Sequence, residues 1–254
     1  MTSTILLTGG TGTLGSHVKP LLQAADADRL RVLSRKPRQS GEGVQYVTGD
    51  LLKDEGVQAA VDGADVIVHL AGASKGDDVA TANLATAAAR AHVRHLVYIS
   101  VTAADKLPIG YFRAKLGAER AIADSGVPWS TLRAAQFHDL VLMMARKLTK
   151  LPVVPSPGVL RLQPVDSREV AARLVELALG SPAGLVPDLV GPRVYAFSDL
   201  ARGYLRAAGR RRVLMPVPIP GKAGRAYRAG ENLSLDGAQI GERTWEDFLA
   251  ERVK

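Results

Sequence analysis

The chain has 254 residues, 46% of them hydrophobic and 23% charged, which is typical of a soluble globular protein with a sizeable core. It contains no cysteine, which excludes disulfides, thiolate zinc sites and cysteine nucleophiles. The net charge is +8, but no helix-turn-helix pattern or row of aromatic residues accompanies it. We therefore expect a solvated basic face that attracts anionic cofactors, and no nucleic-acid partner.

Targeting and metal-binding patterns are missing from the sequence. The N-terminus lacks the basic and apolar regions of a signal peptide, and the apolar run at 140–145 is too short to span a bilayer. The five histidines include no pair with the spacing of a zinc protease, so we expect no metal. The expectation is a cytoplasmic protein without membrane contact, either a monomer or a homodimer.

Short β-branched runs alternate with helical stretches through the first half of the chain. The expected strands are Thr4–Thr8, Leu30–Ser34, Val44–Thr48, Asp65–Leu70, His95–Ser100 and Trp129–Arg133. The expected helices lie near 13–25, 53–61, 78–91 and 112–125. Near-continuous aliphatic residues suit strands that are buried on both faces. The pattern predicts an α/β fold with a doubly wound parallel sheet, the Rossmann fold.

The rhythm changes after Arg133. The later elements are expected to be a helix at 138–149, a proline-rich loop at 150–160, a helix at 166–180 capped by Asp166 or Ser167, a strand near 185–190, a helix at 198–208 and a basic tail. We predict a nucleotide-binding core at 1–135. The remainder, 136–254, is predicted to be a smaller C-terminal substrate lobe that packs on the core as one unit.

A glycine-rich turn, ILLTGGTGTLGSHV, follows the first strand at residues 5–18. It satisfies both GxGxxG and GxxGxxG, and a strand precedes it while a helix follows it. Glycine lets backbone amides touch a pyrophosphate, and the helix N-terminus adds partial positive charge. The predicted cofactor-binding residues of this turn are Gly9, Thr11, Gly12, Thr13, Leu14 and Gly15.

The residues after the second strand discriminate between cofactors. An NAD site is expected to have an acidic residue there, whereas this chain places Arg35 and Lys36 at that point. Cations bind a 2′-phosphate, so the sequence favours NADP(H) over NAD. Further along, Asp50 and Leu51 are expected to flank the adenine. The small residues Ala71, Gly72 and Ala73 would let the dinucleotide cross the sheet edge.

Several segments together resemble a known family. TGGTGTLG, GDL, HLAG, VYISV, YFRAKLGAER and TLRAAQFHD occur in this order, as in the NmrA-like, atypical group of short-chain dehydrogenases/reductases. The glycine spacing fits the extended and atypical branches, and the likeness covers almost the whole chain. The resemblance implies the Rossmann fold, but the group includes reductases, isomerases and regulators that bind the cofactor without known turnover.

The YFRAK segment places Tyr111 and Lys115 on one face of a helix. The resemblance implies that Tyr111 exchanges a proton with a substrate oxygen and that Lys115 also holds the nicotinamide ribose. A nearby ammonium, together with an oxidised nicotinamide, is expected to favour the phenolate of Tyr111. The family's other partners are a serine, for which Ser100 is the candidate, and an asparagine. Asn83 is displaced from that place, and Asp77 or Asp78 lies nearer to it.

Residues after the sixth strand are candidates for the substrate pocket. The resemblance places Gln136 and Phe137 in the pocket wall, while His138 either faces the substrate or only begins a helix. The sequence as a whole predicts an NADP(H)-dependent oxidoreductase that acts on a small carbonyl or enone metabolite, with a tyrosine as proton donor. The alternative is a non-catalytic NADP(H)-binding redox sensor.

Overall fold

Two compact units make up the chain, and each combines segments that are distant in sequence. The computed structural model describes residues 3–25, 29–41, 43–72, 75–158 and 160–253. Unit 1 comprises Met1–Ser100, Gly110–Leu132 and Val170–Val186, and unit 2 comprises Val101–Ile109, Arg133–Glu169 and Pro187–Lys254. The units therefore interleave in sequence, whereas the sequence predicts a single division at residue 135.

Unit 1 is built on a mostly parallel sheet. Its strands are β1 (Thr4–Thr8), β2 (Arg29–Ser34), β3 (Val44–Thr48), β4 (Val66–His69), β5 (His95–Val101), β6 (Trp129–Ala134) and β9 (Gly184–Leu185), of which β5 and β6 end in unit 2. They are ordered β3-β2-β1-β4-β5-β6-β9, with β1 parallel to both β2 and β4. The predicted Rossmann fold is confirmed, because this strand order reverses direction at β1.

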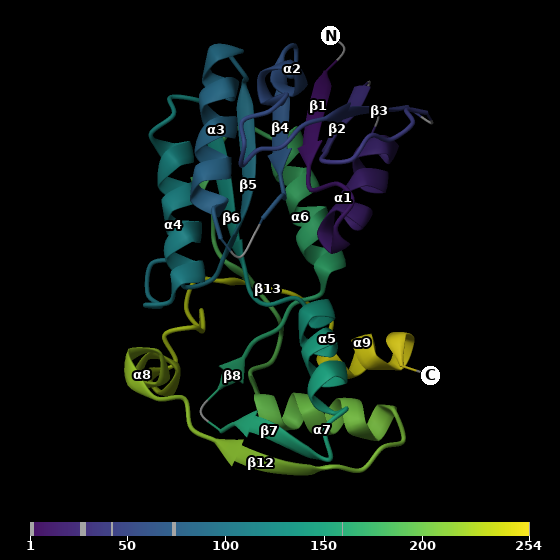
Figure 1. Ribbon diagram of the computed structural model, residues 1–254, viewed down its shortest axis with the longest axis vertical. Coiled ribbons are helices and arrows are strands. Elements are labelled where there is room, and N and C mark those ends of the chain that lie inside the picture. Colours follow the sequence, from purple (N-terminus) through teal and green to yellow (C-terminus); the bar gives the residue numbers. More distant parts are fainter. Residues whose placement is uncertain (1–2, 26–28, 42, 73–74, 159, 254) are drawn as a thin grey trace. The chain divides into compact units, whose positions relative to one another are not determined.

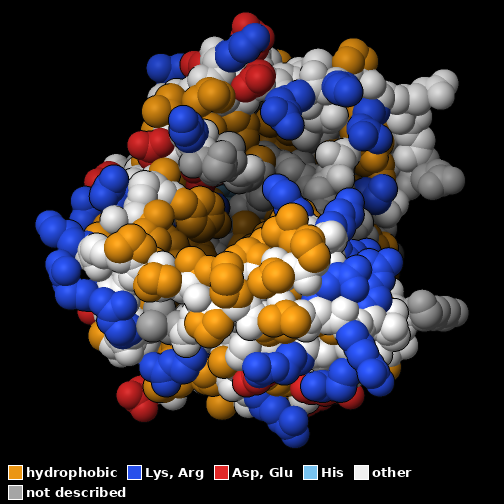
Figure 2. All heavy atoms as spheres, turned by 60° about the horizontal axis from the view of Figure 1, so that its bottom comes forward, with side chains coloured by type: hydrophobic (Ala, Val, Ile, Leu, Met, Phe, Trp, Pro, Cys, Tyr) orange, Lys and Arg blue, Asp and Glu red, His pale blue; other side chains and the backbone are white. Residues whose placement is uncertain are grey.

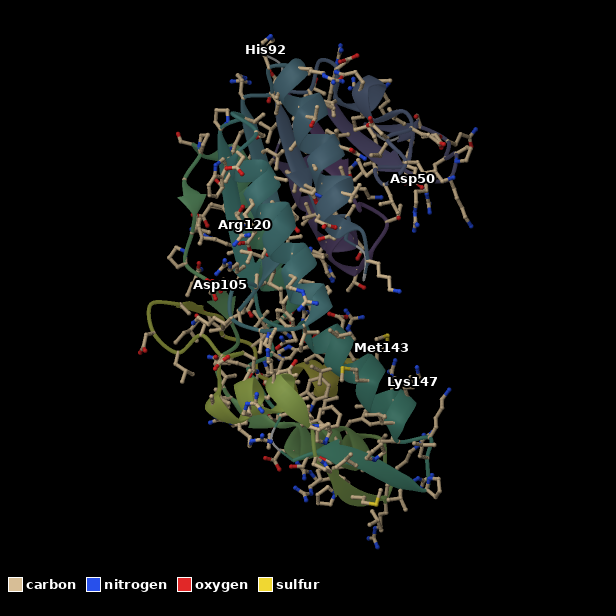
Figure 3. All side chains as sticks on the ribbon, turned by 60° about the vertical axis from the view of Figure 1, so that its left-hand side comes forward. Asp50, His92, Asp105, Arg120, Met143 and Lys147 are labelled. Carbon is tan, nitrogen blue, oxygen red and sulfur yellow. The ribbon has the colours of Figure 1, made fainter. Side chains whose placement is uncertain are left out.

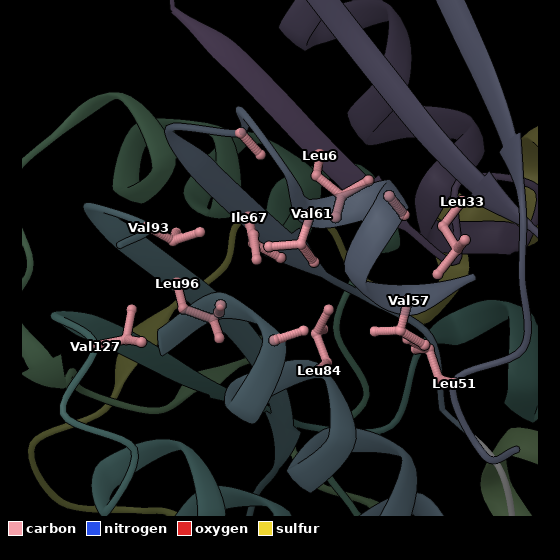
Figure 4. Packing of buried hydrophobic residues seen from close by; sticks show 14 of the residues in the cluster. Leu6, Leu33, Leu51, Val57, Val61, Ile67, Leu84, Val93, Leu96 and Val127 are labelled. Atoms are coloured by element: carbon pink, nitrogen blue, oxygen red, sulfur yellow. The ribbon is translucent and has the colours of Figure 1, made fainter. Parts of the chain in front are cut away.

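Helices cover both faces of this sheet. They are α1 (Thr13–Ala24), α2 (Val57–Val61), α3 (Asp77–Arg90), α4 (Gly110–Ala123) and α6 (Ser167–Leu179), which begins in unit 2. Figure 1 shows α3 and α4 side by side in front of the strands and α6 behind them. Between α2–α4 and the sheet lies an apolar core that includes Leu6, Ile67, Leu84 and Leu96 (Figure 4). Its burial stabilises the sheet that carries the glycine turn.

Unit 2 has its own core. Its elements are α5 (His138–Leu148), β7 (Val153–Pro157), β8 (Arg161–Leu162), β10 (Leu189–Val190), β11 (Tyr195–Ala196), α7 (Phe197–Ala207), β12 (Val213–Val217), α8 (Gly221–Ala229), β13 (Gln239–Ile240) and α9 (Trp245–Arg252). The core includes Leu142, Phe197, Leu200, Trp245 and Phe248, contributed by α5, α7 and α9. In the same unit Leu189 of β10 pairs in parallel with Ala134, the last residue of β6.

The loop predicted from the sequence at 150–160 is wrong in part, because this segment contains a strand. Val153–Pro157 forms β7, which pairs in parallel with β12 from Val153↔Val213 to Pro157↔Val217. In this two-stranded sheet each strand has an edge without a described strand partner, so prolines lacking an N–H are tolerated. The pair exposes Val153, Val213 and Met215. Figure 2, with the bottom of Figure 1 forward, shows a band of hydrophobic side chains bordered by Lys and Arg.

Two further predictions differ in detail. The helix expected at 53–61 is only Val57–Val61, because Gly56 adopts a left-handed conformation (φ 69°) immediately before it. The strand expected near 185–190 is divided into β9 and β10, separated at Pro187. Among the described helices, none has both the length and the apolar character needed to cross a membrane.

Candidate functional site

The glycine turn between β1 and α1 is closed so tightly that side chains are excluded. Gly9 has φ 69°, and a Cβ on it would lie 2.6 Å from the Ala71 nitrogen. A Cβ on Gly15 would collide with the Gly9 carbonyl oxygen and lie 2.5 Å from the Gly10 Cα. The Gly12 amide donates to the Gly9 carbonyl at 3.0 Å. Glycine is therefore required at Gly9 and Gly15, the first and last glycines of the GxxGxxG frame, whereas a Cβ on Gly12 would meet only the Gly9 carbonyl oxygen, at 3.4 Å.

Helix α1 begins directly from this turn. Gly12 is its N-cap residue in extended backbone, and it supplies no side-chain cap. Thr11 and Thr13 are exposed beside it, whereas Leu14 is buried beneath. The first turn of α1 therefore presents backbone N–H groups and the positive end of the helix dipole, which suit a phosphate.

The turn after β2 carries exposed cations. Arg35 and Lys36 are both exposed, and the Lys36 amide donates to the Ser34 hydroxyl at 3.3 Å. In the loop after β3, Asp50 (Figure 3) accepts hydrogen bonds from the Leu52 amide at 2.9 Å and the Lys53 amide at 3.3 Å. The Asp50 carboxylate thus stabilises the turn formed by the residues that directly follow it.

Leu51 and Ala71, two of the residues predicted to contact the cofactor, are both fixed by contacts within unit 1. Leu51 is buried in the apolar core, and its carbonyl accepts from the Asn83 side-chain amide at 2.8 Å. The Ala71 amide donates to the Thr8 hydroxyl at 3.2 Å, and Gly72 beside it is exposed. Ala73, the third small residue predicted here, lies outside the described residues.

A fully buried histidine supports the loop after β4. His69 lies with Nδ1 2.7 Å from the Thr8 hydroxyl and Nε2 3.0 Å from the Thr81 hydroxyl. Burial lowers its pKa to about 3, with Asp77 opposing and Lys115 adding to the shift. A neutral imidazole therefore ties β1, β4 and α3 together beneath Ala71, a role that the sequence analysis did not find.

Helix α4 carries the predicted Tyr111 and Lys115 one turn apart. Tyr111 is 39% exposed near the helix N-terminus, whereas the Lys115 side chain is only 7% exposed. The Lys115 Nζ lies 3.0 Å from Asp77 Oδ2 and 3.1 Å from the Tyr98 hydroxyl. The Tyr98 hydroxyl in turn donates to Asp77 Oδ2 at 3.0 Å. A Cβ on Gly72 would lie 3.3 Å from that Nζ, so the lysine lies directly beneath the exposed Gly72.

The surroundings of Tyr111 favour its protonated form. Burial raises its pKa from the usual value, and the negative charge of Asp77 raises it further. The fall expected from the Lys115 ammonium together with an oxidised nicotinamide stays a prediction; within the chain itself the Asp77 carboxylate lies 3.0 Å from that ammonium and offsets its charge. A phenol with a raised pKa stays protonated at neutral pH, which suits a proton donor better than a base.

Most of the candidates for the serine and the asparagine that the family resemblance implies form hydrogen bonds or ion pairs with nearby residues of the chain. The Ser100 hydroxyl, at the end of β5, donates to Glu119 Oε1 at 2.5 Å. Of the three candidates for the family's asparagine, Asp77 is buried at the start of α3 and contacts Lys115. Asp78 is exposed, and Asn83 bonds to a loop carbonyl. Tyr98 was missed, although a tyrosine within an aliphatic strand requires a partner for its hydroxyl.

The three predicted substrate-pocket residues belong to unit 2. The Gln136 carbonyl accepts from the Val165 amide at 3.0 Å, and Phe137 lies in a bridge to the same residue. The His138 side chain is fully buried, with ring centroids 5.8 Å from Trp245 and 5.2 Å from Phe248. The structure therefore places the His138 ring in the core of unit 2.

The residues of unit 1 fit a dinucleotide. The Cβ-excluding cradle of Gly9 and Gly15, the N-terminus of α1 and the exposed cations Arg35 and Lys36 supply the donors that phosphates need. In the described part of the chain, no three His, Asp or Glu side chains are grouped so that they could hold a metal ion.

Comparisons with known proteins agree with this geometry. Residues 9–178 match a protein family described as NAD(P)H-binding. The chain is similar to a (4-alkanoyl-5-oxo-2,5-dihydrofuran-3-yl)methyl phosphate reductase of Streptomyces griseus, with 32% identity over 220 residues, 81% of this chain and 74% of the relative. It is also similar to an NAD(P)H azoreductase of Xenophilus azovorans, with 29% identity over 213 residues, covering 81% and 74%.

A solved structure shows the same fold. The crystal structure of an NADPH-dependent quinone oxidoreductase from Escherichia coli in complex with NADPH superposes with a TM-score of 0.84. It covers 98% of this chain and 100% of the other at 18% identity.

The matched residues span more than half of the chain, so the protein belongs to the NAD(P)H-binding family. With relatives that are named reductases, it is an enzyme of the NAD(P)H-dependent reductase class. The predictions of a nicotinamide dinucleotide cofactor and of an oxidoreductase are confirmed at this level.

Proposed function

We propose that the protein is an NADPH-dependent reductase of a small carbonyl or enone compound, with Tyr111 as the proton donor. The observation that carries the proposal is the placement of a half-exposed tyrosine one turn before a buried lysine, in the unit that also holds the glycine cradle. Bound NADPH would supply the hydride. Tyr111, protonated at neutral pH, would donate its proton to the substrate oxygen as negative charge develops there.

The choice of NADPH over NADH rests on the turn after β2. Arg35 and Lys36 are exposed and able to bind a 2′-phosphate, and the sequence from Ser34 to Arg38 contains no acidic residue. The solved relative from E. coli is an NADPH-dependent quinone oxidoreductase crystallised with NADPH, which supports the same choice.

The choice of a conjugated carbonyl substrate rests on the relatives. A quinone is a conjugated dicarbonyl compound, and the name of the S. griseus relative places alkanoyl and oxo groups on a dihydrofuran ring. Reduction of a conjugated carbonyl compound by NADPH adds a hydride and a proton to its conjugated π system, and negative charge develops on the carbonyl oxygen. Such a reaction needs a proton donor near the acceptor oxygen, which is the role proposed for Tyr111.

The test compares the wild type with Tyr111→Phe on a panel of quinones, enones and simple ketones, following NADPH oxidation. The phenylalanine lacks the donated proton, so kcat is expected to fall about 10²- to 10⁴-fold while the Kd for NADPH is unchanged. Tyr227→Phe, which removes a hydroxyl from α8 of unit 2, is the matched control and should keep wild-type rates. Unchanged turnover in Tyr111→Phe would refute the proton-donor role.

The non-catalytic sensor stays an alternative because two of the groups expected to take part in catalysis, the Ser100 hydroxyl and the Lys115 ammonium, already bond to other side chains of the protein. Ser100 is bonded to Glu119, and Lys115 is bonded to Asp77 and Tyr98. A sensor would bind NADPH and oxidise none of it with any acceptor in the panel. Turnover that depends on Tyr111 would exclude this alternative.

A further inference from the structure

Three protein groups surround the Lys115 ammonium. Its Nζ lies 3.0 Å from Asp77 Oδ2, 3.1 Å from the Tyr98 hydroxyl and 3.3 Å from the Ile99 carbonyl oxygen. An ammonium has three hydrogens to donate, so these three acceptors match its full capacity. The pair of charged side chains is buried, with 7% of Lys115 and 2% of Asp77 exposed. Lys115 is therefore held by unit 1 before any cofactor arrives.

The charge of this cluster is balanced. Asp77 from α3 and Lys115 from α4 carry opposite charges 3.0 Å apart, so a group farther away experiences a dipole and not a lone cation. The Tyr98 hydroxyl accepts from Lys115 and donates to Asp77, which fixes the orientation of that dipole. Its ring also lies 4.9 Å from the ammonium, in a cation–π contact.

We propose that Asp77 is the counter-ion of Lys115 and acts as a positioning residue for Tyr111. By neutralising the ammonium, Asp77 prevents Lys115 from driving Tyr111 to the phenolate, so Tyr111 works as an acid. This inference rests on the proposed function, because it explains why the tyrosine of this chain suits reduction. It gives Asp77 the role of offsetting the Lys115 charge and Tyr98 the role of orienting the ion pair. Neither role follows from the Tyr111–Lys115 spacing alone.

Other titratable groups near the cluster leave the assignment unchanged. From β4, His69 stacks on Tyr98 at 5.2 Å, and burial lowers its pKa to about 3, so it is neutral at working pH. From α4, Glu119 is engaged by Ser100. The pKa of Tyr111 is raised by burial and then by Asp77. From α3, Asp78 lies against α4, where a Cβ on Gly117 would be 3.0 Å from the Asp78 Cβ, but Asp78 is exposed to solvent, which screens its charge. The Asp77–Lys115 pair is the buried charge of this cluster.

The experiment measures the titration midpoint of Tyr111 directly by the near-ultraviolet absorbance of the phenolate, without substrate. Each protein is paired with the same protein carrying Tyr111→Phe, and the difference isolates Tyr111 from the other five tyrosines. Three variants are compared with the wild type, namely Asp77→Asn, Lys115→Met and the double variant Asp77→Asn/Lys115→Met. The alkaline limb of the kcat/KM profile provides a second readout.

Each variant has an expected sign. Asp77→Asn leaves an uncompensated cation and should lower the Tyr111 midpoint by about one pH unit or more. Lys115→Met leaves an uncompensated anion and should raise the midpoint. The double variant removes both charges and should show no rise in the midpoint and a smaller shift than either single variant. An unchanged midpoint in Asp77→Asn, or a rise of about one unit in the double variant, would overturn the proposal.

The double variant protects the test from misfolding. Removing one member of a buried ion pair is strongly destabilising, whereas replacing both by uncharged side chains is often neutral, so the double variant is expected to fold. Its midpoint discriminates by itself, because a dominant Lys115 predicts a rise, whereas an ammonium that Asp77 offsets predicts none. If Tyr111→Phe kept full activity, the proposed function would fail while these midpoints still decided the role of Asp77.

Discussion

Gly15 is the residue at which the glycine turn tolerates the least change. A Cβ there would meet the Gly9 carbonyl and lie 2.5 Å from the Gly10 Cα, and both are backbone atoms that cannot rotate away. Gly15→Ala is therefore expected to lower the free energy of unfolding by about 1–3 kcal/mol. It should also weaken NADPH binding by displacing the cradle. Chemical denaturation and fluorescence titration with NADPH measure the two effects.

Gly41→Ala is the matched control for this substitution. Gly41 is an exposed residue of unit 1, and a Cβ on it has no heavy atom within 4 Å. The control should change the free energy of unfolding by less than about 0.5 kcal/mol and leave the Kd for NADPH unchanged. If both substitutions had equal effects, the close packing at Gly15 would not be the cause.

Arg35 and Lys36 determine the preference for NADPH in this account. Replacing both by alanine removes charge-assisted hydrogen bonds to a 2′-phosphate, so the Kd for NADPH should rise about 10- to 100-fold. The Kd for NADH should stay the same, since NADH lacks that phosphate. Arg29→Ala, at the opposite end of β2, is the control and should alter neither constant. A parallel loss of NADH affinity would contradict the assignment.

The sequence predicts the residues whose role depends on local spacing. The glycine turn and Arg35 follow from the positions of β1 and β2, and Lys115 follows Tyr111 by one helical turn. The contacts of Lys115 with Asp77 and Tyr98 could not be derived in this way, because they join α3, β5 and α4. The pKa of Tyr111 is raised first by burial and then by the charge of Asp77, and neither cause can be derived from local spacing.

At the scale of the helix, the start of α5 makes the stability of unit 2 sensitive to acid. Burial of His138 against α9 lowers its pKa from 6.5 to about 4, although Asp166 and Asp139 oppose the shift. The unfolded chain therefore binds the proton more readily. The stabilising contribution is complete above pH 6.5 and is lost as the pH falls from 6.5 toward 4.

The measurement is the free energy of unfolding at pH 7 and pH 5 for the wild type and His138→Phe. A shift from 6.5 to about 4 corresponds to a loss of about 2 kcal/mol over this interval, and His138→Phe should lose that much less than the wild type. His69, with a pKa of about 3, adds a similar loss that both proteins share. Equal losses in the two proteins would show that His138 is not buried in its neutral form.

The elements of the first half are predictable because their strands are buried on both faces and their helices follow at regular intervals. The expected bounds of β1 and β3 agree with the structure, and those of β2 differ by one residue. Strand β7 escaped prediction because its partner, β12, lies 60 residues later and two of its five residues are prolines. A pairing of that kind is set by tertiary structure and leaves no local period in the sequence.

Across the whole chain, the residues assigned to the cofactor and to proton donation belong to unit 1. The glycine cradle, Arg35, Lys36, Tyr111 and Lys115 all fall within its segments, whereas Gln136, Phe137 and His138 belong to unit 2. The net charge of +8 favours attraction of an anionic cofactor.

The most direct test of the central claim is a single-turnover reaction of the full chain loaded with one equivalent of NADPH and mixed rapidly with excess quinone. Loading before mixing separates cofactor binding from chemistry. The wild type should oxidise the bound NADPH in a single exponential phase. Tyr111→Phe should reach the same amplitude about 100-fold or more slowly. Equal rates for the two proteins, or no oxidation by the wild type with any conjugated carbonyl, would contradict the account.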